Sequence, residues 1–421
     1  MIIGGGFGGL TAARELVDGD VDVTLVDRHS HHLFQPLLYQ AACGGLGAGE
    51  VATPIREPLR DARNVDVLMA AATDIDVAAR RVRLDSGETL AYDSLIVACG
   101  AETSYFGNAA LGEHSYALKT LADTLALRER VFSAFEEAER AGNAADRDRW
   151  GTFVVVGGGP TGVEFAGELG LLTHRILKRS FRNWDPASAK VHLLDAGPRL
   201  TAAFDPRLST KVGHYLDELD VSVHHGARVN AIDEHGVDFT VDGRDERIEA
   251  RTVVWAAGVQ AVGLCAKLAA SAGVQPDRAG HLPVGQDCSL AGHPEISVIG
   301  DAAATPGPGD RPLPGLATVA IQQARHVCEG IRAGAPGANG PFKYFDKGAL
   351  AVVGRGRAVC EVRGLRLSGR PAFFMYLTVH MYYLTGGGPG HRLKVLIDWL
   401  NARFGQPQNQ VIEGELPPRG S

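Results

Sequence analysis

The feature that most restricts the fold of this chain is a glycine-rich turn of the form G-x-G-x-x-G, which occurs at Gly4–Gly9 and again at Gly157–Gly162. Apolar residues typical of a buried strand precede each turn, and apolar residues at helical spacing follow it. In this setting the glycines let the backbone approach a pyrophosphate, which binds to the free N–H groups at the start of the helix. The repeat therefore predicts an α/β protein with two Rossmann-like dinucleotide-binding domains.

Both units continue in the same order after the turn. The next strand ends in an acid, Asp27 in the first unit and Asp195 in the second, where the motif places a residue that binds a ribose hydroxyl. An acid there repels a 2′-phosphate, so the second site is predicted to prefer NADH to NADPH, although the nearby Arg199 weakens this preference. Each unit closes with an apolar strand that ends in glycine, at Gly100 and at Gly258.

A third strand ending points to the same kind of site. Residues 297–299 form a short apolar strand that is followed by Gly300 and Asp301. Ligands of open α/β sheets bind at the carboxyl ends of the strands. Asp301 is therefore a candidate contact for the central part of the first dinucleotide.

Charge, histidine and cysteine patterns exclude several other functions. The 42 basic and 49 acidic residues give a net charge of -7, so no overall positive field attracts nucleic acid. The pairs His31-His32 and His224-His225 lack further ligands at matching spacing, and no metal site is predicted. The six cysteines form no close pair in sequence, and the first residues enter a strand at once; both features predict a cytoplasmic protein.

Over nearly its whole length the chain resembles the type II NADH dehydrogenases, which are single-subunit NADH:quinone oxidoreductases. The most family-specific match is the segment His31–Gln40, with the sequence HHLFQPLLYQ. The resemblance implies a flavoprotein with FAD in the first site, NADH as the co-substrate of the second, and quinone as the small-molecule acceptor. Other matching stretches are 4–10, 155–169, 255–258, 299–301 and 346–351.

The resemblance also implies the order of the domains. The FAD-binding domain is expected to be discontinuous, with a first part at 1–118 and a second part at 259–340. The NADH-binding domain, 119–258, would be inserted between them. Residues 341–421 would form a C-terminal α+β and helical region at a membrane interface.

Three residues are placed at the reaction centre by the same resemblance. Glu164 would lie between the nicotinamide and quinone sides of the flavin, and Lys347 near the isoalloxazine ring. Gln322 belongs to a quinone-side motif, here Ala317–Gln323, in which Thr318 stands where the family has glutamine. Each residue also has a structural alternative. Glu164 could be an acid that the N-terminal helix dipole favours, Lys347 an exposed lysine, and Gln322 a residue on a helix surface. The expected FAD contacts are Gly4, Gly6, Phe7, Gly8, Gly9, Asp27, Arg28, Gln40, Gly100 and Asp301, and the expected NADH contacts are Gly157, Gly159, Gly162, Asp195 and Gly258.

Two C-terminal segments, 372–384 and 391–404, have the pattern of helices at a membrane surface. The first is mostly apolar but shorter than the ~20 residues that span a bilayer. The second suits an interfacial helix, and equally a helix packed on the protein body or on a partner in a homodimer. The acidic, proline-broken tail at 413–418 departs from the family. We therefore expect a cytoplasmic protein, with peripheral attachment to the inner face of the cell membrane through 372–404 as the alternative. The apolar face of the second segment comprises Leu393, Leu396, Ile397, Leu400 and Phe404.

The expected reaction is a ping-pong transfer in which hydride passes from NADH to FAD and two electrons then pass to a quinone, without proton pumping. His380, on the apolar segment, is a further candidate for proton transfer, with a packing role as its alternative. Two other functions stay open. Thr318 and the unusual tail favour a soluble NADH-dependent flavoprotein reductase with a non-quinone acceptor, and the third reading is a redox-sensing protein that binds FAD and NADH without turnover.

Overall fold

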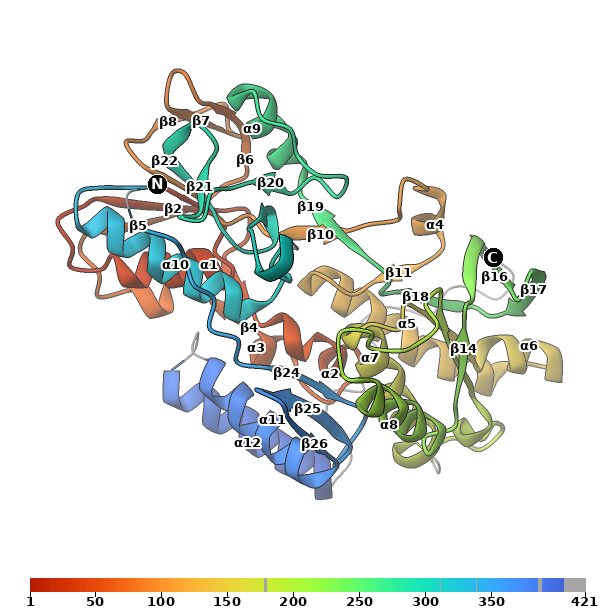
Figure 1. Ribbon diagram of the computed structural model, residues 1–421. Coiled ribbons are helices and arrows are strands. Elements are labelled where there is room, and N and C mark those ends of the chain that lie inside the picture. Colours follow the sequence, from red (N-terminus) through yellow and green to blue (C-terminus); the bar gives the residue numbers. More distant parts are fainter. Residues whose placement is uncertain (178–179, 311, 338, 385–387, 405–421) are drawn as a thin grey trace.

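The computed structural model describes residues 1–177, 180–310, 312–337, 339–384 and 388–404, of which residues 310 and 400–404 are described by their backbone alone. Figure 1 shows three parts: one domain around the first glycine turn, a second around the repeated turn, and a smaller C-terminal part in blue that lies below the first domain and beside the second. The expected tail at 413–418 and the side chains of Leu400 and Phe404 lie outside the described residues.

The first domain contains a six-stranded sheet in the order β21-β22-β9-β1-β2-β5. All strands except β21 run parallel, which agrees with strand-turn-helix units. Since β22 pairs with β9 from far earlier in the chain, the domain is discontinuous, as the sequence predicts. The strands are β1 (Ile2–Ile3), β2 (Val23–Asp27), β5 (Val65–Met69), β9 (Leu95–Val97), β21 (Ser289–Leu290) and β22 (His293–Val298).

Apolar layers cover both faces of this sheet. On one face α1 (Phe7–Glu15) and α10 (Ala317–Arg332) pack side by side, and Leu10 and Ala324 join the same buried cluster. On the other face α9 (Gly263–Ala272) packs with a three-stranded sheet, where Val82 is fully buried. That small sheet consists of β6 (Ala72–Asp76), β7 (Arg81–Leu84) and β8 (Thr89–Ala91).

The second domain contains a parallel five-stranded sheet in the order β11-β18-β12-β13-β14. Its first strand lies at Tyr116–Ala117, just before residue 119, where the sequence suggests that the domain begins. The helices α5 (Leu121–Arg140), α7 (Pro160–Leu171) and α8 (Pro206–Asp217) share one core with one face of this sheet. The other strands are β12 (Thr152–Val156), β13 (Lys190–Asp195), β14 (Val221–His225) and β18 (Thr252–Trp255), and the sheet that covers the second face consists of β15 (Arg228–Asp233), β16 (Gly236–Val241) and β17 (Arg244–Glu249).

The chain crosses between the two domains twice, and the crossings pair with each other. β10 (Ala101–Thr103) and β19 (Val259–Ala261) form an antiparallel two-stranded ribbon. The Ser104 hydroxyl donates to Gln260 at 2.9 Å, and the Trp255 indole N–H donates to the Ser104 carbonyl at 2.9 Å. This pairing holds the inserted domain at a defined place beside the first.

The C-terminal part packs on the second domain rather than forming a separate core. Tyr376 and Val395 belong to the same buried cluster as the helices of that domain. The cluster also includes α2 (Leu38–Ala42), so the family-specific segment at 31–40 is held between the first domain and the C-terminal helices. This part consists of β24 (Ala349–Val352), β25 (Ala358–Val362), β26 (Leu365–Ser368), α11 (Arg370–Tyr383) and α12 (Gly388–Phe404).

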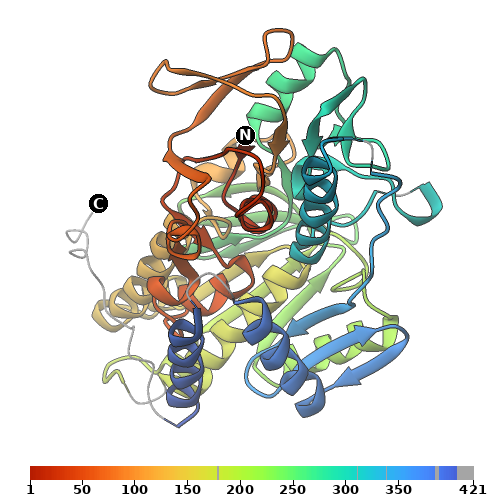
Figure 2. The same ribbon diagram turned by 90° about the vertical axis from the view of Figure 1, so that its left-hand side faces the viewer.

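The two C-terminal helices lie next to each other, as Figure 2 shows in dark blue, and α12 also contacts α3 (Ala48–Val51). Lys394 forms an ion pair with the buried Glu50, and His391 lies 3.1 Å from the Gly49 carbonyl oxygen. Within the described residues, no helix combines the length and the apolar character that a bilayer crossing requires. The remaining elements are β3 (His31–Leu33), β4 (Ala52–Pro54), α4 (Ala110–Glu113), α6 (Ala144–Trp150), β20 (Leu282–Pro283) and β23 (Ala303–Ala304).

Candidate active site

The first glycine turn forms a cradle that side chains would fill. Gly4 has a φ of 100°, which disfavours other residues, and a Cβ atom on Gly9 would overlap the Gly4 carbonyl oxygen. Gly6, in contrast, faces open space. No side chain caps α1 and no acid lies in its first turn, so its N–H groups face the cradle without an internal anion. These features fit a bound pyrophosphate.

The second turn repeats this geometry. Gly157 has a φ of 110°, a Cβ atom on Gly162 would overlap the Gly157 carbonyl oxygen, and Gly159 faces open space. The start of α7 again has neither a side-chain cap nor a first-turn acid. Among the α-helices that the structure describes, α5, α6 and α8 carry such caps, whereas α9, α10 and α11 do not. At the two glycine turns the uncapped N–H groups also face a backbone cradle, and this combination is suited to an external anion.

The two strand-end acids are tied to the turns that they follow. Asp27 accepts a hydrogen bond from the Gly5 N–H at 2.5 Å, and Asp195 accepts one from the Gly158 N–H at 3.1 Å. Arg199 donates to the Ala202 carbonyl at 2.6 Å and is thus directed toward the backbone. Arg28, also expected at the first cofactor, is exposed at the end of β2.

We expect Asp195→Ala to weaken the discrimination between NADH and NADPH. The substitution removes the carboxylate that would accept from the ribose hydroxyl and repel a 2′-phosphate, an effect of about 1.5 to 3 kcal/mol. The KM for NADH should rise about tenfold or more, while NADPH use improves relative to NADH. Asp220→Ala, which removes an exposed acid of the same domain, is the control; equal KM ratios in both variants would contradict the assignment.

Two buried side chains, Gln323 and Thr305, hold the turn that contains Asp301. The Gly300 N–H donates to Gln323 at 2.8 Å, and Gln323 in turn donates to the Thr305 hydroxyl at 2.6 Å. Lys119 lies 3.5 Å from the Asp301 carboxylate. Sequence reasoning did not find Lys119, which carries no motif; Gln323 was visible only as part of the segment Ala317–Gln323. Gly100 and Gly258 each lie three residues after the end of β9 and of β18, and Phe7 and Gly8 begin α1.

Glu164 points from the second turn of α7 toward the C-terminal sheet. Its carboxylate accepts a hydrogen bond from the Val352 N–H at 3.2 Å. Burial of the carboxyl group raises the pKa of Glu164 to about 8, and the hydrogen bond lowers the pKa by less. One helical turn later lies Glu168, which is 8% exposed, and burial raises its pKa as well, opposed by Arg355. Two carboxyl groups whose pKa values are raised by burial therefore share one face of α7.

Gln322 and Lys347 are placed on the segment that leads into the C-terminal part. Gln322 exchanges two hydrogen bonds with the backbone of Phe345, at 3.0 and 3.1 Å. Lys347 is exposed and donates to the Tyr383 hydroxyl at 2.8 Å. Thr318, the departure from the family motif, pairs with the Tyr344 hydroxyl at 3.0 Å. These residues join α10 and α11 to the loop between them.

Gln40, expected at the flavin, is half-buried and contacts aromatic side chains of the C-terminal helices. Its amide nitrogen donates to the hydroxyls of Tyr39 and Tyr376 at 3.0 and 3.2 Å, and its oxygen accepts from the Trp399 indole at 2.8 Å. His380 stacks near Tyr376, with ring centroids 3.9 Å apart. These contacts bring together α2, α11 and α12, which no local sequence pattern predicts.

Two further findings concern metals and thiols. In the part of the chain that the structure describes, no group of three or more His, Cys, Asp or Glu side chains could hold a metal ion. The sulfur atoms of Cys99 and Cys265 approach to 3.6 Å although the residues are distant in sequence. The cysteines are dispersed along the sequence, but the packing of α9 against the sheet that contains β9 brings these two together.

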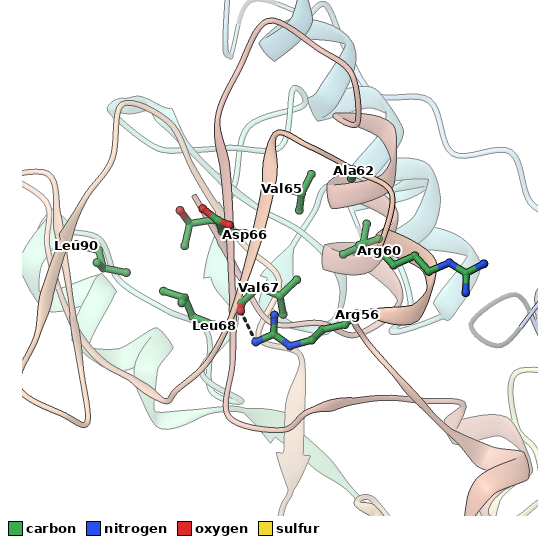
Figure 3. Close-up of a pocket in the computed structure, with 10 residues that line it drawn as sticks. Arg56, Arg60, Ala62, Val65, Asp66, Val67, Leu68 and Leu90 are labelled. Carbon is green, nitrogen blue, oxygen red and sulfur yellow. Dashed lines mark hydrogen bonds between the residues drawn. The ribbon is translucent and has the colours of Figure 1, made fainter.

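A surface hollow of about 450 Å³ lies at the outer edge of the first sheet, beside β5 (Figure 3). Arg56 crosses this edge and donates to the Val67 carbonyl at 2.7 Å, and Arg60 lies beside it. None of the lining residues belongs to either glycine turn. The hollow is therefore not part of the dinucleotide sites.

Comparisons with known proteins agree with this geometry. The family described as pyridine nucleotide-disulphide oxidoreductase matches residues 1–324. Two Mycobacterium tuberculosis proteins are named type II NADH:quinone oxidoreductase, Ndh and NdhA. Ndh is 43% identical over 96% of this chain and 89% of its own length, and NdhA is 41% identical over 98% of this chain and 88% of its own length.

Solved structures share the fold. The structure of NDH2 from Plasmodium falciparum in complex with NADH has a TM-score of 0.89 at 20% identity, and the match covers 98% of this chain and 99% of that one. The sulfide:quinone oxidoreductase of Aquifex aeolicus has a TM-score of 0.73 at 19% identity, covering 95% and 94%. The chain has two fingerprint turns and a half-buried glutamate that contacts the C-terminal part. With relatives of this identity, it belongs to the type II NADH:quinone oxidoreductases of the pyridine nucleotide-disulphide oxidoreductase family.

Proposed function

We propose that this chain oxidises NADH and reduces a quinone, with FAD bound in the first glycine cradle. The observation that carries this proposal is the pair of uncapped cradles, together with α7, which begins at the second cradle and whose Glu164 contacts the C-terminal part. The residues that would hold FAD are those of the first turn together with Asp27 and Asp301, and the second turn with Asp195 would hold NADH. When bound, FAD accepts hydride from NADH and supplies two electrons to the acceptor.

The protein has to supply a proton for this reaction. A quinone takes up two electrons and two protons, whereas a hydride carries two electrons and one proton, so one further proton comes from the solvent. Glu164 suits this role because burial raises its pKa to about 8, which keeps the carboxyl group largely protonated at neutral pH. We therefore assign Glu164 as the proton donor on the quinone side.

Flavin absorbance tests the proposal directly. Rapid addition of NADH to the yellow protein should bleach the flavin, and a soluble quinone such as menadione should then restore the absorbance. Bleaching without quinone-dependent recovery would favour a different acceptor. A protein that stays yellow after NADH addition would favour a binding function without turnover.

We also propose that α11 and α12 attach the protein to a membrane surface at the inner face of the cell membrane. Large apolar side chains on these helices are exposed, among them Phe374 at 72% and Leu393 at 57%. Leu393 lies beside Lys394, whose side chain is 63% exposed although it pairs with Glu50, and an exposed cation suits a surface with anionic lipids. A second copy of the chain is the competing occupant, and sedimentation of the lipid-free protein distinguishes a homodimer from a monomer. The exposed apolar side chains are Phe374, Tyr382, Leu393, Leu396 and Ile397.

The double variant Phe374→Ser and Leu393→Ser should bind vesicles at least about tenfold more weakly, because two large apolar side chains no longer enter the lipid. Co-sedimentation with vesicles of phosphatidylglycerol and phosphatidylcholine measures this binding. Met69→Ser, which changes a side chain that is 65% exposed at the edge of the first sheet, should bind like the unchanged protein. Equal binding by all three proteins would exclude these helices as the attachment site.

A further inference from the structure

Phe106 has a strained backbone although its side chain is largely exposed. Its φ is 52°, in the left-handed region that costs a residue with a bulky side chain free energy. Among the non-glycine residues that the structure describes with a positive φ, Phe106 is the only aromatic one. Because its side chain is 70% exposed, packing offsets little of this cost. A role outside the hydrophobic core therefore has to account for this residue.

Hydrogen bonds to the end of β18 hold Phe106 in this conformation. The Ser104 N–H donates to the Gly258 carbonyl at 3.1 Å, and the Trp255 indole N–H donates to the Ser104 carbonyl at 2.9 Å. The Phe106 N–H donates to the Ser104 hydroxyl at 3.3 Å. The segment before Phe106 is thus fixed to the second domain at three points, and a local rotation of the backbone cannot relax the strain.

The Phe106 ring covers Gly258 beside the second glycine cradle. A Cβ atom on Gly258 would lie 2.6 Å from the Phe106 Cζ atom, so the ring takes the place of a side chain there. Two residues before Gly258, the backbone of Ala256 borders the cradle, since a Cβ atom on Gly157 would lie 2.7 Å from the Ala256 carbonyl oxygen. β18 pairs with β12, which leads into the glycine turn. The ring therefore lies at the carboxyl ends of these strands, where α/β sheets bind their ligands.

The surface around Gly258 offers apolar contact. Val259, the next residue, is 49% exposed, and the Phe106 ring meets the Trp255 ring only edge to face, with centroids 6.3 Å apart. A dinucleotide carries an anionic pyrophosphate, which suits the glycine turn, and also flat rings, which suit aromatic side chains. The turn and the Phe106 ring are thus suited to two different parts of one ligand.

We propose that Phe106 is a further NADH-binding residue, whose ring packs against the dinucleotide held in the second cradle. The strained backbone keeps the ring at the edge of the cradle before the ligand arrives, so less side-chain freedom is lost on binding. The contact adds affinity by removing apolar surface from water and needs no charge. This inference rests on the proposed oxidation of NADH and deepens it, because Phe106 belongs to neither glycine motif.

The variant Phe106→Asn separates the ring from the backbone conformation. Asparagine tolerates the left-handed region, so the segment should keep its path while the ring is lost. Calorimetric titration of the oxidised, FAD-containing protein with NAD measures binding without turnover, and the Kd should rise about tenfold. The NADH concentration that gives half the maximal rate of flavin bleaching should rise by a similar factor. Phe106→Tyr, which retains the ring, should bind NAD within about twofold of the unchanged protein.

Urea unfolding gives a second measurement, which a packing role would move in the opposite direction. Under the proposal, Phe106→Asn relieves backbone strain and loses little packing, so the midpoint of unfolding should stay equal or rise. Unchanged or tighter NAD binding by this variant would overturn the proposal. Weaker NAD binding together with a lower midpoint would assign the ring to packing and would overturn it as well.

Two further points keep the test decisive. If Phe106→Asn fails to fold, Phe106→Gly supplies the affinity measurement, because glycine adopts a positive φ readily. If the unchanged protein binds NAD and is bleached by NADH but menadione does not restore the flavin absorbance, the proposed quinone reduction fails. The NAD affinities of the variants then still decide whether Phe106 contacts the dinucleotide.

Discussion

Replacing Gly162 by valine is expected to leave a yellow protein that NADH no longer bleaches. A Cβ atom at this position would overlap the Gly157 carbonyl oxygen, so the turn and the start of α7 cannot keep their present approach. The N–H groups that bind the pyrophosphate then move away from the ligand. The first cradle is formed by a separate sheet and should keep its FAD.

Affinity for NADH should fall by about 100-fold or more, since several charged hydrogen bonds of about 1.5 to 3 kcal/mol are lost together. Titration of flavin bleaching with NADH measures this loss. Gly9→Val is the reciprocal variant, because its Cβ atom would overlap the Gly4 carbonyl oxygen and should give a colourless protein. Bleaching of Gly162→Val at the usual NADH concentration would show that the second turn is not the NADH site.

The parts that the sequence predicts best are those determined by local backbone chemistry. β12 (Thr152–Val156) is the apolar strand expected before the second turn, and α1 and α7 begin within their glycine turns, at Phe7 and Pro160. Glycine at a positive φ or in contact with a carbonyl has no substitute, so the turns are visible in the sequence alone. The strand-end acids are visible because each ends the first strand after its turn, although the intervals differ: Asp27 follows Gly9 by 18 residues and Asp195 follows Gly162 by 33.

The contacts between distant segments could not be read from the sequence. Gln40 meets Tyr376 and Trp399 only because α2, α11 and α12 share one core with the second domain. Lys119 reaches Asp301 because the chain crosses between the domains at that point. Such pairs depend on how whole elements pack, and periodicity describes only single elements.

The sequence also did not indicate the protonation state of Glu164. Its position two residues after Gly162 is typical of an acid that the helix dipole stabilises as an anion. In the structure, the loss of water around the carboxyl group outweighs this effect and raises the pKa to about 8. Burial by β24, which follows nearly two hundred residues later, is the cause, and only the tertiary structure contains it.

We expect Glu164→Gln to slow quinone-dependent reoxidation of the flavin by about 100-fold or more while reduction by NADH changes little. Glutamine keeps the shape and the contact with the Val352 N–H but cannot release a proton, and a positioned acid contributes roughly 10²- to 10⁴-fold. In the unchanged protein the rate of reoxidation should decline as the pH rises through about 8, where Glu164 loses its proton. The variant should lack this decline. Stopped-flow traces with menadione between pH 6 and about 9.5 measure both effects.

Stability gives an independent check with a defined sign. The pKa of Glu164 is raised in the folded state from 4.5 to about 8, so the folded protein binds more protons than the unfolded chain between these values. The contribution of this group to stability is therefore largest below pH 4.5 and is lost as the pH rises toward 8. Glu164→Gln removes this loss. The free energy of unfolding of the variant, relative to the unchanged protein, should therefore be higher above pH 8 than in acid. Because part of the side chain is exposed, we expect this difference to be roughly 1 to 3 kcal/mol. Urea unfolding of both proteins at pH 5 and pH 8.5 measures the difference; parallel pH dependences would mean that the carboxyl group is already ionised at neutral pH and cannot donate the proton.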